Sequence, residues 1–275
     1  MKLQQVLGLM MLSLAMAGCP PTSNETTMLS SAPLTKEALF GKGHLFYGQL
    51  QFDSATVYLT QAVRHDSLYA DPIVDLAALH YDLAMQNNTG ASEAAGLFRL
   101  SRDYYDRADK LGWQDSELLE RLCDISVRLD DQPSFLRYAK KNAKKYPYDR
   151  QYSNLGLAYV EAGEYQEGIK FLKSAIEKFP NSTYIGSYYR QLGRAYYKVD
   201  RHQTAERTFY DGLKAVDTKL MELEKLASPS SVSQERLRDD KIGMLVTLKG
   251  LHLLYKDGEK LANVEKQLKE LGYTK

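Results

Sequence analysis

One stretch of the chain, residues 152–180, reads YSNLGLAYVEAGEYQEGIKFLKSAIEKFP. It opens with an aromatic residue, continues through Leu155 and Gly156, and places a second aromatic residue at Tyr159. Spacings of three and four residues bring these side chains to one face of a helix. After Gly163 a second apolar-periodic segment begins, and it closes with a proline. The stretch therefore predicts two helices packed against each other, with the glycine allowing them to approach closely.

The same arrangement occurs in two other places. Tyr189, Leu192, Gly193 and Tyr196 repeat the first helix, and the two central glycines are 37 residues apart. An earlier copy comprises Leu39, Gly43, Phe46, Phe52, Ala55, Leu59 and Ala62. These copies resemble the tetratricopeptide repeat, in which W-x2-L-G-x2-Y opens a helix pair of about 34 residues. Tyrosine replaces the tryptophan in the two best copies.

Three further helix pairs are weaker. Their segments are residues 72–85 with 98–111, 116–129 with 133–146, and 245–256 with 258–271. In the last pair, Leu248, Leu251 and Tyr255 are assigned to the repeat pattern. One helix pair cannot bury its own apolar stripe, so neighbouring pairs must stack. The resemblance implies that residues 36–275 form an all-α tetratricopeptide-repeat domain, a right-handed superhelical solenoid of about six helix pairs.

The first eighteen residues have a different character. Lys2 is followed by an uncharged segment, residues 6–17, that is too short to span a membrane and is typical of a secretory signal. Small residues precede Cys19, as in bacterial lipoproteins. The resemblance implies that residues 1–18 are a lipoprotein signal peptide and that Cys19 is acylated by palmitate-type chains. The alternative is an ordinary signal peptide cut near Ala17, which leaves Cys19 as a free thiol.

Residues 19–35 are expected to form a lipidated flexible tether, because residues 20–33 are rich in Pro, Ser and Thr and have no apolar period. Pro20 follows the cysteine, where the lipoprotein resemblance would put Asp for inner-membrane retention. We therefore expect an outer-membrane location facing the periplasm. The second cysteine, Cys123, has apolar neighbours and is predicted to be buried.

Composition and motifs narrow the possible functions. Lys and Arg number 36 against 35 Asp and Glu, which does not favour a nucleic-acid partner. The five histidines have no metal-ligand spacing, and no phosphate-binding glycine loop or nucleophile motif occurs. We therefore predict no metal, no cofactor and no enzyme activity. The acid pairs Asp103/Asp106 and Asp130/Asp131 are interpreted as solvated, with acid–base catalysis as the alternative.

The resemblance also implies where a partner binds. In that family, set positions on the first helix of each pair line a concave groove. Here they hold His44 and Tyr47 in the first pair, an acidic row in the third, and a basic row with one tyrosine in the fifth. The acidic row is Glu117, Glu120 and Asp124; the fifth pair supplies Arg190, Arg194, Tyr197 and Lys198. We expect the basic row to face solvent and hold an acidic or C-terminal partner segment. The alternative is an ordinary solvated helix face.

Three functions follow from this reading. The first is a membrane-anchored scaffold or adaptor for proteins of the bacterial cell envelope. The second is a helical accessory component that escorts a small ligand or a partner to an envelope transporter, which a large apolar cavity would favour. The third is an enzyme, which would require clustered carboxylates or a histidine pair in the groove.

Overall fold

The computed structural model describes residues 33–273, apart from residues 87, 88 and 229. The predicted signal peptide, Cys19 and most of the tether thus lie outside the described residues. Residues 35–275 form one compact unit, separate from residues 1–34. All further description concerns this unit.

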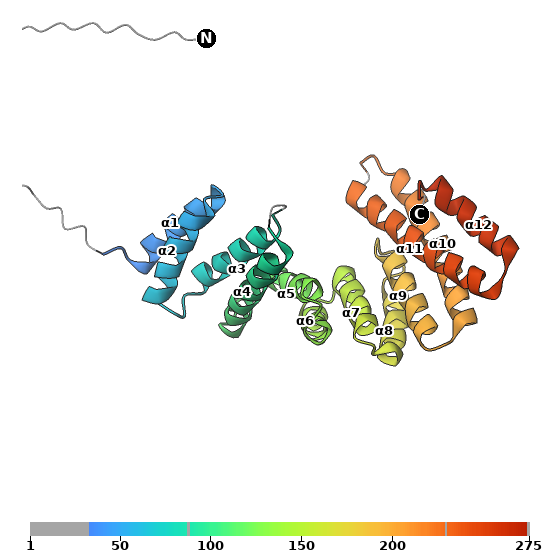
Figure 1. The fold of residues 1–275 in the computed structure, drawn as a ribbon, viewed down its shortest axis with the longest axis horizontal. Coiled ribbons are helices and arrows are strands. Elements are labelled where there is room, and N and C mark those ends of the chain that lie inside the picture. The colour runs from blue at the N-terminus through green and yellow to red at the C-terminus, as the bar shows by residue number, and fades with distance from the viewer. Residues whose placement is uncertain (1–32, 87–88, 229, 274–275) are drawn as a thin grey trace, which may run out of the picture. The chain divides into compact units, whose positions relative to one another are not determined.

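Twelve α-helices and no strands are found in the part of the chain that the structure describes (Figure 1). They are α1 (Lys36–Gly48), α2 (Phe52–His65), α3 (Ala70–Ala84), α4 (Ala91–Lys110), α5 (Ser116–Arg128), α6 (Gln132–Lys145), α7 (Asp149–Glu161), α8 (Tyr165–Lys178), α9 (Ile185–Lys198), α10 (His202–Glu224), α11 (Ser231–Tyr255) and α12 (Gly258–Glu270). None of these helices combines the length and the apolar character that a membrane crossing requires.

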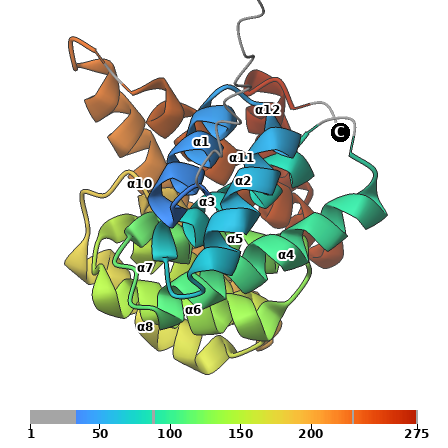
Figure 2. The ribbon, with the colours of Figure 1, turned by 90° about the vertical axis from the view of Figure 1, so that its left-hand side faces the viewer.

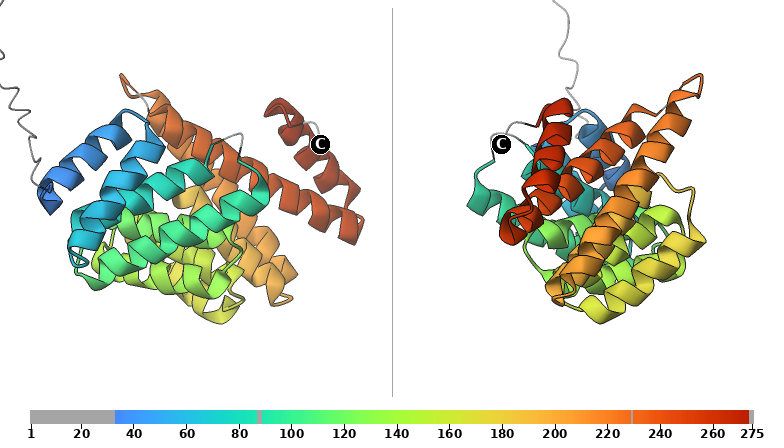
Figure 3. Two further views of the ribbon diagram at one scale, coloured as in Figure 1. Left: turned by 60° about the vertical axis from the view of Figure 1, so that its left-hand side comes forward. Right: turned by 90° about the vertical axis from the view of Figure 1, so that its right-hand side faces the viewer.

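Consecutive helices pack on one another in chain order. Each odd-numbered helix pairs with the next one, and each pair also contacts the following pair. Figure 2 views the array from the α1 end, and Figure 3 gives two further views of it. The last helix, α12, contacts α11. We call the odd-numbered helices A helices and the even-numbered ones B helices. The predicted all-α solenoid of about six helix pairs is confirmed.

The small residues of the three strong copies lie where the pattern predicts. A Cβ atom added at Gly193 would lie 2.4 Å from the ring of Phe209 in α10. At Gly156 it would lie 2.3 Å from Leu172, and at Gly43 it would lie 2.7 Å from Leu59. Each glycine therefore sets the separation between an A helix and its own B helix.

The ends of the A helices give an independent measure of the repeat register. In five pairs a residue with left-handed backbone conformation, φ between 53° and 76°, follows the A helix: Leu50, Asp130, Gly163, Asp200 and Lys256. In the first four cases this residue lies seven positions after the small residue, namely Gly43, Cys123, Gly156 and Gly193. We call the small residue of each A helix its close-contact position.

The same rule puts Lys249 at the close-contact position of α11. The sequence-based register of the sixth pair is therefore wrong by three residues. Leu245, Leu248 and His252 fill the buried pattern positions, whereas Tyr255 is exposed. Closely spaced leucines fit both registers, because residues three and four apart share a helix face.

The buried side chains form three clusters along the stack, and Tyr188 and Phe209 are the largest fully buried side chains. Tyr152 and Tyr196 are half-buried and pack against the edge of this core. Cys123 is buried, as predicted, and burial raises the pKa of its thiol to about 12. A thiol in this state is a packing group rather than a nucleophile.

Candidate functional site

We call the side of the stack that carries the A helices the A face. Cα atoms of α1 and α3, of α7 and α9, and of α9 and α11 approach within 8 Å. Those of α3 and α5, and of α5 and α7, remain farther apart. The wider spacing around α5 leaves room on the A face that backbone packing does not fill.

A hollow of about 490 Å³ occupies this room. We call it the central hollow. Its lining comes from α3, α5 and α7. The lining residues are Tyr81, Ser116, Glu117, Glu120, Arg121, Asp124 and Arg150. It contains the whole predicted acidic row, together with two arginines and a tyrosine that were not assigned to a site from the sequence.

Tyr81 and Arg121 form one wall of the central hollow. The Tyr81 hydroxyl donates a hydrogen bond of 2.5 Å to Asp124, which also accepts one from Arg128 at 2.6 Å. The guanidinium of Arg121 lies over the Tyr81 ring, 4.3 Å from its centroid, in a cation–π contact. Burial and the neighbouring Asp124 carboxylate raise the pKa of Tyr81, so this phenol remains a hydrogen-bond donor.

The opposite wall joins α5 to α7. Glu120 accepts a hydrogen bond of 2.8 Å from Gln151 and forms an ion pair of 2.9 Å with Arg150. The Arg150 side chain is nevertheless 55% exposed, and that of Glu117, paired with Arg121, is 65% exposed. The hollow thus presents the cationic Arg150 and the anionic Glu117 to solvent, and the Asp124 side chain is also partly exposed.

The predicted residues of the first pair join α1 to α3. His44 Nδ1 lies 2.7 Å from a carboxylate oxygen of Asp75, and the Tyr47 hydroxyl donates to Asp82 at 2.6 Å. Burial of Asp75 raises the pKa of its carboxyl group, and the contact with His44 opposes this shift. Both predicted residues lie on the A face, where they already contact neighbouring side chains.

Arg190 departs from expectation. Its Nε lies 3.2 Å from a carboxylate oxygen of Asp240, whose side chain is almost fully buried in α11. A Cβ atom at Gly243 would lie 2.9 Å from Cδ of Arg190, so the arginine packs directly against α11. The expectation that the whole basic row faces solvent is therefore wrong for Arg190. The reason is the long α11, whose first half covers this part of α9.

The other residues of the basic row differ in their surroundings. Arg194 bonds Glu161 of α7 and Gln191 of its own helix, both at 2.8 Å. Tyr197 makes an edge contact with the ring of His202. Lys198 is exposed and, within the described residues, forms no ion pair. A partner-binding role for the six predicted residues stays a prediction, and Lys198 is the cation of the row most available for it.

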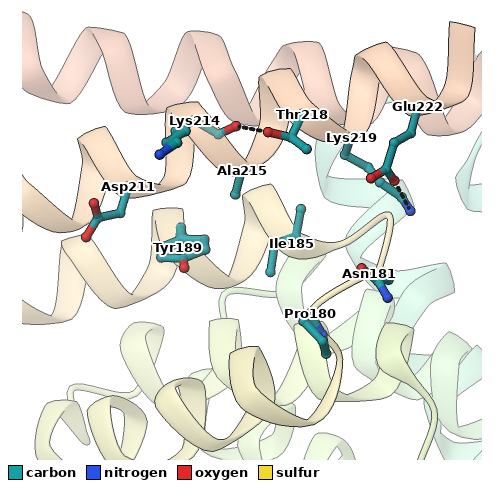
Figure 4. A pocket seen from close by; sticks show the side chains of 10 residues that line it. All are labelled: Pro180, Asn181, Ile185, Tyr189, Asp211, Lys214, Ala215, Thr218, Lys219 and Glu222. Atoms are coloured by element: carbon teal, nitrogen blue, oxygen red, sulfur yellow. Dashed lines mark hydrogen bonds and ion pairs between the residues drawn. The ribbon is translucent and has the colours of Figure 1, made fainter.

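A second hollow, of about 330 Å³, lies between α9, α10 and the loop that precedes α9 (Figure 4). Pro180 and Asn181 of the loop and Ile185 and Tyr189 of α9 line one side. Residues of α10 line the other side and bring charges of both signs, including a Lys219–Glu222 pair. None of the predicted groove residues belongs to it. Across the described ranges, no three His, Cys, Asp or Glu side chains converge as metal ligands.

Comparison with known proteins agrees with this geometry. Residues 151–217 match the family model for the tetratricopeptide repeat. A stretch of 62 residues is 34% identical to human protein O-mannosyl-transferase TMTC2, covering 22% of this chain and 7% of that protein. The chain thus spans only a small part of that relative.

Two solved structures are similar over most of the chain. YrrB, described as a TPR protein with an unusual peptide-binding site, superimposes with a TM-score of 0.52 at 12% identity. That match covers 74% of this chain and 91% of YrrB. MamA gives a TM-score of 0.53 at 18% identity, covering 70% of this chain and 97% of MamA. Residues 151–217 thus carry a tetratricopeptide-repeat match, and the described residues have the fold of a tetratricopeptide-repeat helical solenoid, an architecture that supports a scaffold for protein–protein interactions.

Proposed function

We propose that this protein is a lipid-anchored scaffold of the bacterial cell envelope that binds a polar peptide segment of a partner protein in the central hollow. The observation that carries the proposal is the hollow itself. It opens on the A face where α3, α5 and α7 are most widely separated, and its walls expose Glu117 and Arg150.

The chemistry of the walls suits a peptide. An extended segment offers backbone donors and acceptors, and the exposed side chains of Glu117 and Arg150 can bond to them. Each exposed charge contributes only ~0.2–1 kcal/mol, so binding requires several contacts together. The charged lining does not favour an apolar ligand, which makes the ligand-escort alternative the weaker one.

The membrane anchor rests on the sequence. The small residues before Cys19 support acylation at that cysteine, and the absence of a retention aspartate supports the outer membrane, facing the periplasm. A tether of about fifteen extended residues would reach roughly 50 Å. Such a reach would let the solenoid meet envelope proteins that do not touch the lipid surface.

Site-specific photo-crosslinking in producing cells tests the proposal. A photoreactive amino acid at Glu117, in the central hollow, should crosslink one defined envelope protein. The same amino acid at Glu177, exposed on α8, is the matched control and should not. Adding Arg150→Glu to the Glu117 probe should abolish the crosslink. Equal crosslinking from both probes, or a crosslink unaffected by Arg150→Glu, would reject the central hollow as the binding site.

A further inference from the structure

Later A helices bury two positions against the preceding helix pair, namely the residues five before and two after the close-contact position. All of these residues are buried in the later A helices. They are Leu118 and Ile125 in α5, Gln151 and Ala158 in α7, Tyr188 and Ala195 in α9, and Met244 and Leu251 in α11. Their contacts confirm what covers them. The Tyr188 hydroxyl donates to the Asp149 carbonyl in α7, and Met244 packs over Gly212 in α10.

In α1 the same two positions hold Ala38 and Leu45, and both are exposed. Leu45 is 58% exposed, and it continues a stripe of apolar and small residues along the outer side of α1. This stripe, which we call the N stripe, comprises Ala38, Gly41, Leu45 and Gly48. A solenoid end that remains in water usually carries polar residues instead. The first helix therefore keeps the docking pattern of an internal repeat.

A corresponding stripe is exposed on α11. It comprises Val246, Gly250, Leu253 and Leu254, and the two leucines are 54% and 62% exposed. We call it the C stripe. In α7 the equivalent positions include Ser153 and Glu161, and both side chains contact the next A helix, α9. In α9 they include Arg190, which contacts α11. The C stripe is thus the side of α11 that would receive a following A helix.

The register within the chain shows how such contacts are made. Ser153 lies three residues before the close-contact position of α7. It bonds to Ser187, which lies six residues before the close-contact position of α9. Glu120 and Arg150 show the same shift of three residues. Applied to α11 and a second α1, with Lys249 and Gly43 as references, the shift places Gly250 opposite Gly41. It also places Leu254 opposite Leu45.

We propose that a second copy of this chain docks its N stripe on the C stripe, so that copies associate head to tail. The interface continues the A-helix packing seen between α7, α9 and α11, and it joins the first and the last A helix, α1 and α11 (Figure 1). Paired glycines allow close approach of the two helices, and the leucines cover the contact. Because the two surfaces differ, the association gives a chain or a ring of copies rather than a two-fold symmetric dimer. A contact this small is weak, and its extent rises with protein concentration.

Cysteine crosslinking of the full-length chain tests the docking. A Cβ atom at Gly41 or at Gly250 meets no atom within 4 Å, so Gly41→Cys and Gly250→Cys leave the fold intact. When the two variants are mixed and oxidised, mass spectrometry should find a 41–250 disulfide between chains. Lys266→Cys, exposed on α12, replaces Gly250→Cys in the control and should give no link.

A charge in the stripe should break the contact. Leu45→Glu, added to the Gly41→Cys chain, should lower the yield of the 41–250 link at least about tenfold. Val57→Glu, at an exposed apolar residue of α2 outside the stripe, should leave the yield unchanged. The proposal is overturned by predominant 41–41 or 250–250 links, which indicate symmetric pairing. It is also overturned if no link between chains forms at all.

Discussion

Replacing Gly193 by alanine probes the closest contact between an A helix and its B helix. The new Cβ would lie 2.4 Å from Cε1 of Phe209 and 2.7 Å from both Cδ1 and Cζ. Carbon atoms pack at about 3.5–4.0 Å, so the ring must withdraw by about 1 Å. Phe209 is fully buried, so the ring can move only by displacing its neighbours. Overpacking of this kind costs about 1–3 kcal/mol.

The same substitution at Gly96 in α4 is the matched control, because a Cβ there meets nothing within 4 Å. Alanine favours a helix over glycine by about 0.8–1.0 kcal/mol, and this gain is common to both variants. The difference between Gly193→Ala and Gly96→Ala therefore isolates the clash. We expect Gly96→Ala to be the more stable variant by about 1–3 kcal/mol.

The assay must resolve parts of the stack, because repeat arrays need not unfold in one step. Amide hydrogen exchange should show weaker protection in α9 and α10 of Gly193→Ala, with α1 to α4 unaffected. The melting temperature should fall by about 2–4 °C for each kcal/mol lost. Adding Phe209→Leu should recover part of the loss, since the two sites are coupled. Equal stability of Gly193→Ala and Gly96→Ala would refute the assigned helix spacing.

Three further perturbations have defined outcomes. Burial raises the pKa of Asp240 to about 6 from 3.8, with Arg190 and Arg236 opposing the shift. The native protein therefore holds this proton between about pH 4 and 6 while the unfolded chain has lost it. The free energy of unfolding should fall by up to about 3 kcal/mol as pH rises through that window, and Asp240→Asn should flatten the slope in melts at stepped pH. Arg190→Glu should lower the melting temperature by placing a second acid beside Asp240, whereas Lys198→Glu should not; equal effects would contradict the ion pair. Cys19→Ala should abolish incorporation of an alkyne fatty acid, and label retained in that variant would reject lipidation.

The fold was predictable from the three strong copies because their small and aromatic residues have fixed roles. Gly43, Gly156 and Gly193 each lie under a B-helix side chain, as their spacing predicts. The sixth pair was placed three residues out of register because a charged residue, Lys249, occupies its close-contact position. The mark that corrects it is the left-handed residue that follows five of the A helices, and at Lys256 no glycine or asparagine signals it.

The site was predictable in part. Family positions brought Glu117, Glu120 and Asp124 to one surface, and the structure places all three in the central hollow. Arg150 could have been found by the same rule, because it lies six residues before Gly156, as Glu117 lies before Cys123. Tyr81 could not, since the second pair has an irregular connection and no clear register. The ion pair of Arg190 depends on a partner 50 residues away, at a position that the repeat pattern does not specify.

Side chains at the same set of A-helix positions have three different roles along this molecule. The separation of neighbouring A helices determines which role they have. Where α9 and α11 approach closely, Arg190 forms an internal ion pair with Asp240. Where α5 lies farther from its neighbours, comparable side chains bridge the space incompletely and leave a hollow with exposed charges. On α11, which has no following A helix among the described residues, these positions are apolar and exposed. A charge at one of these positions is therefore evidence of partner binding only once the distance to the next A helix is known. For this reason the sequence predicted the surroundings of the basic row less well than those of the acidic row.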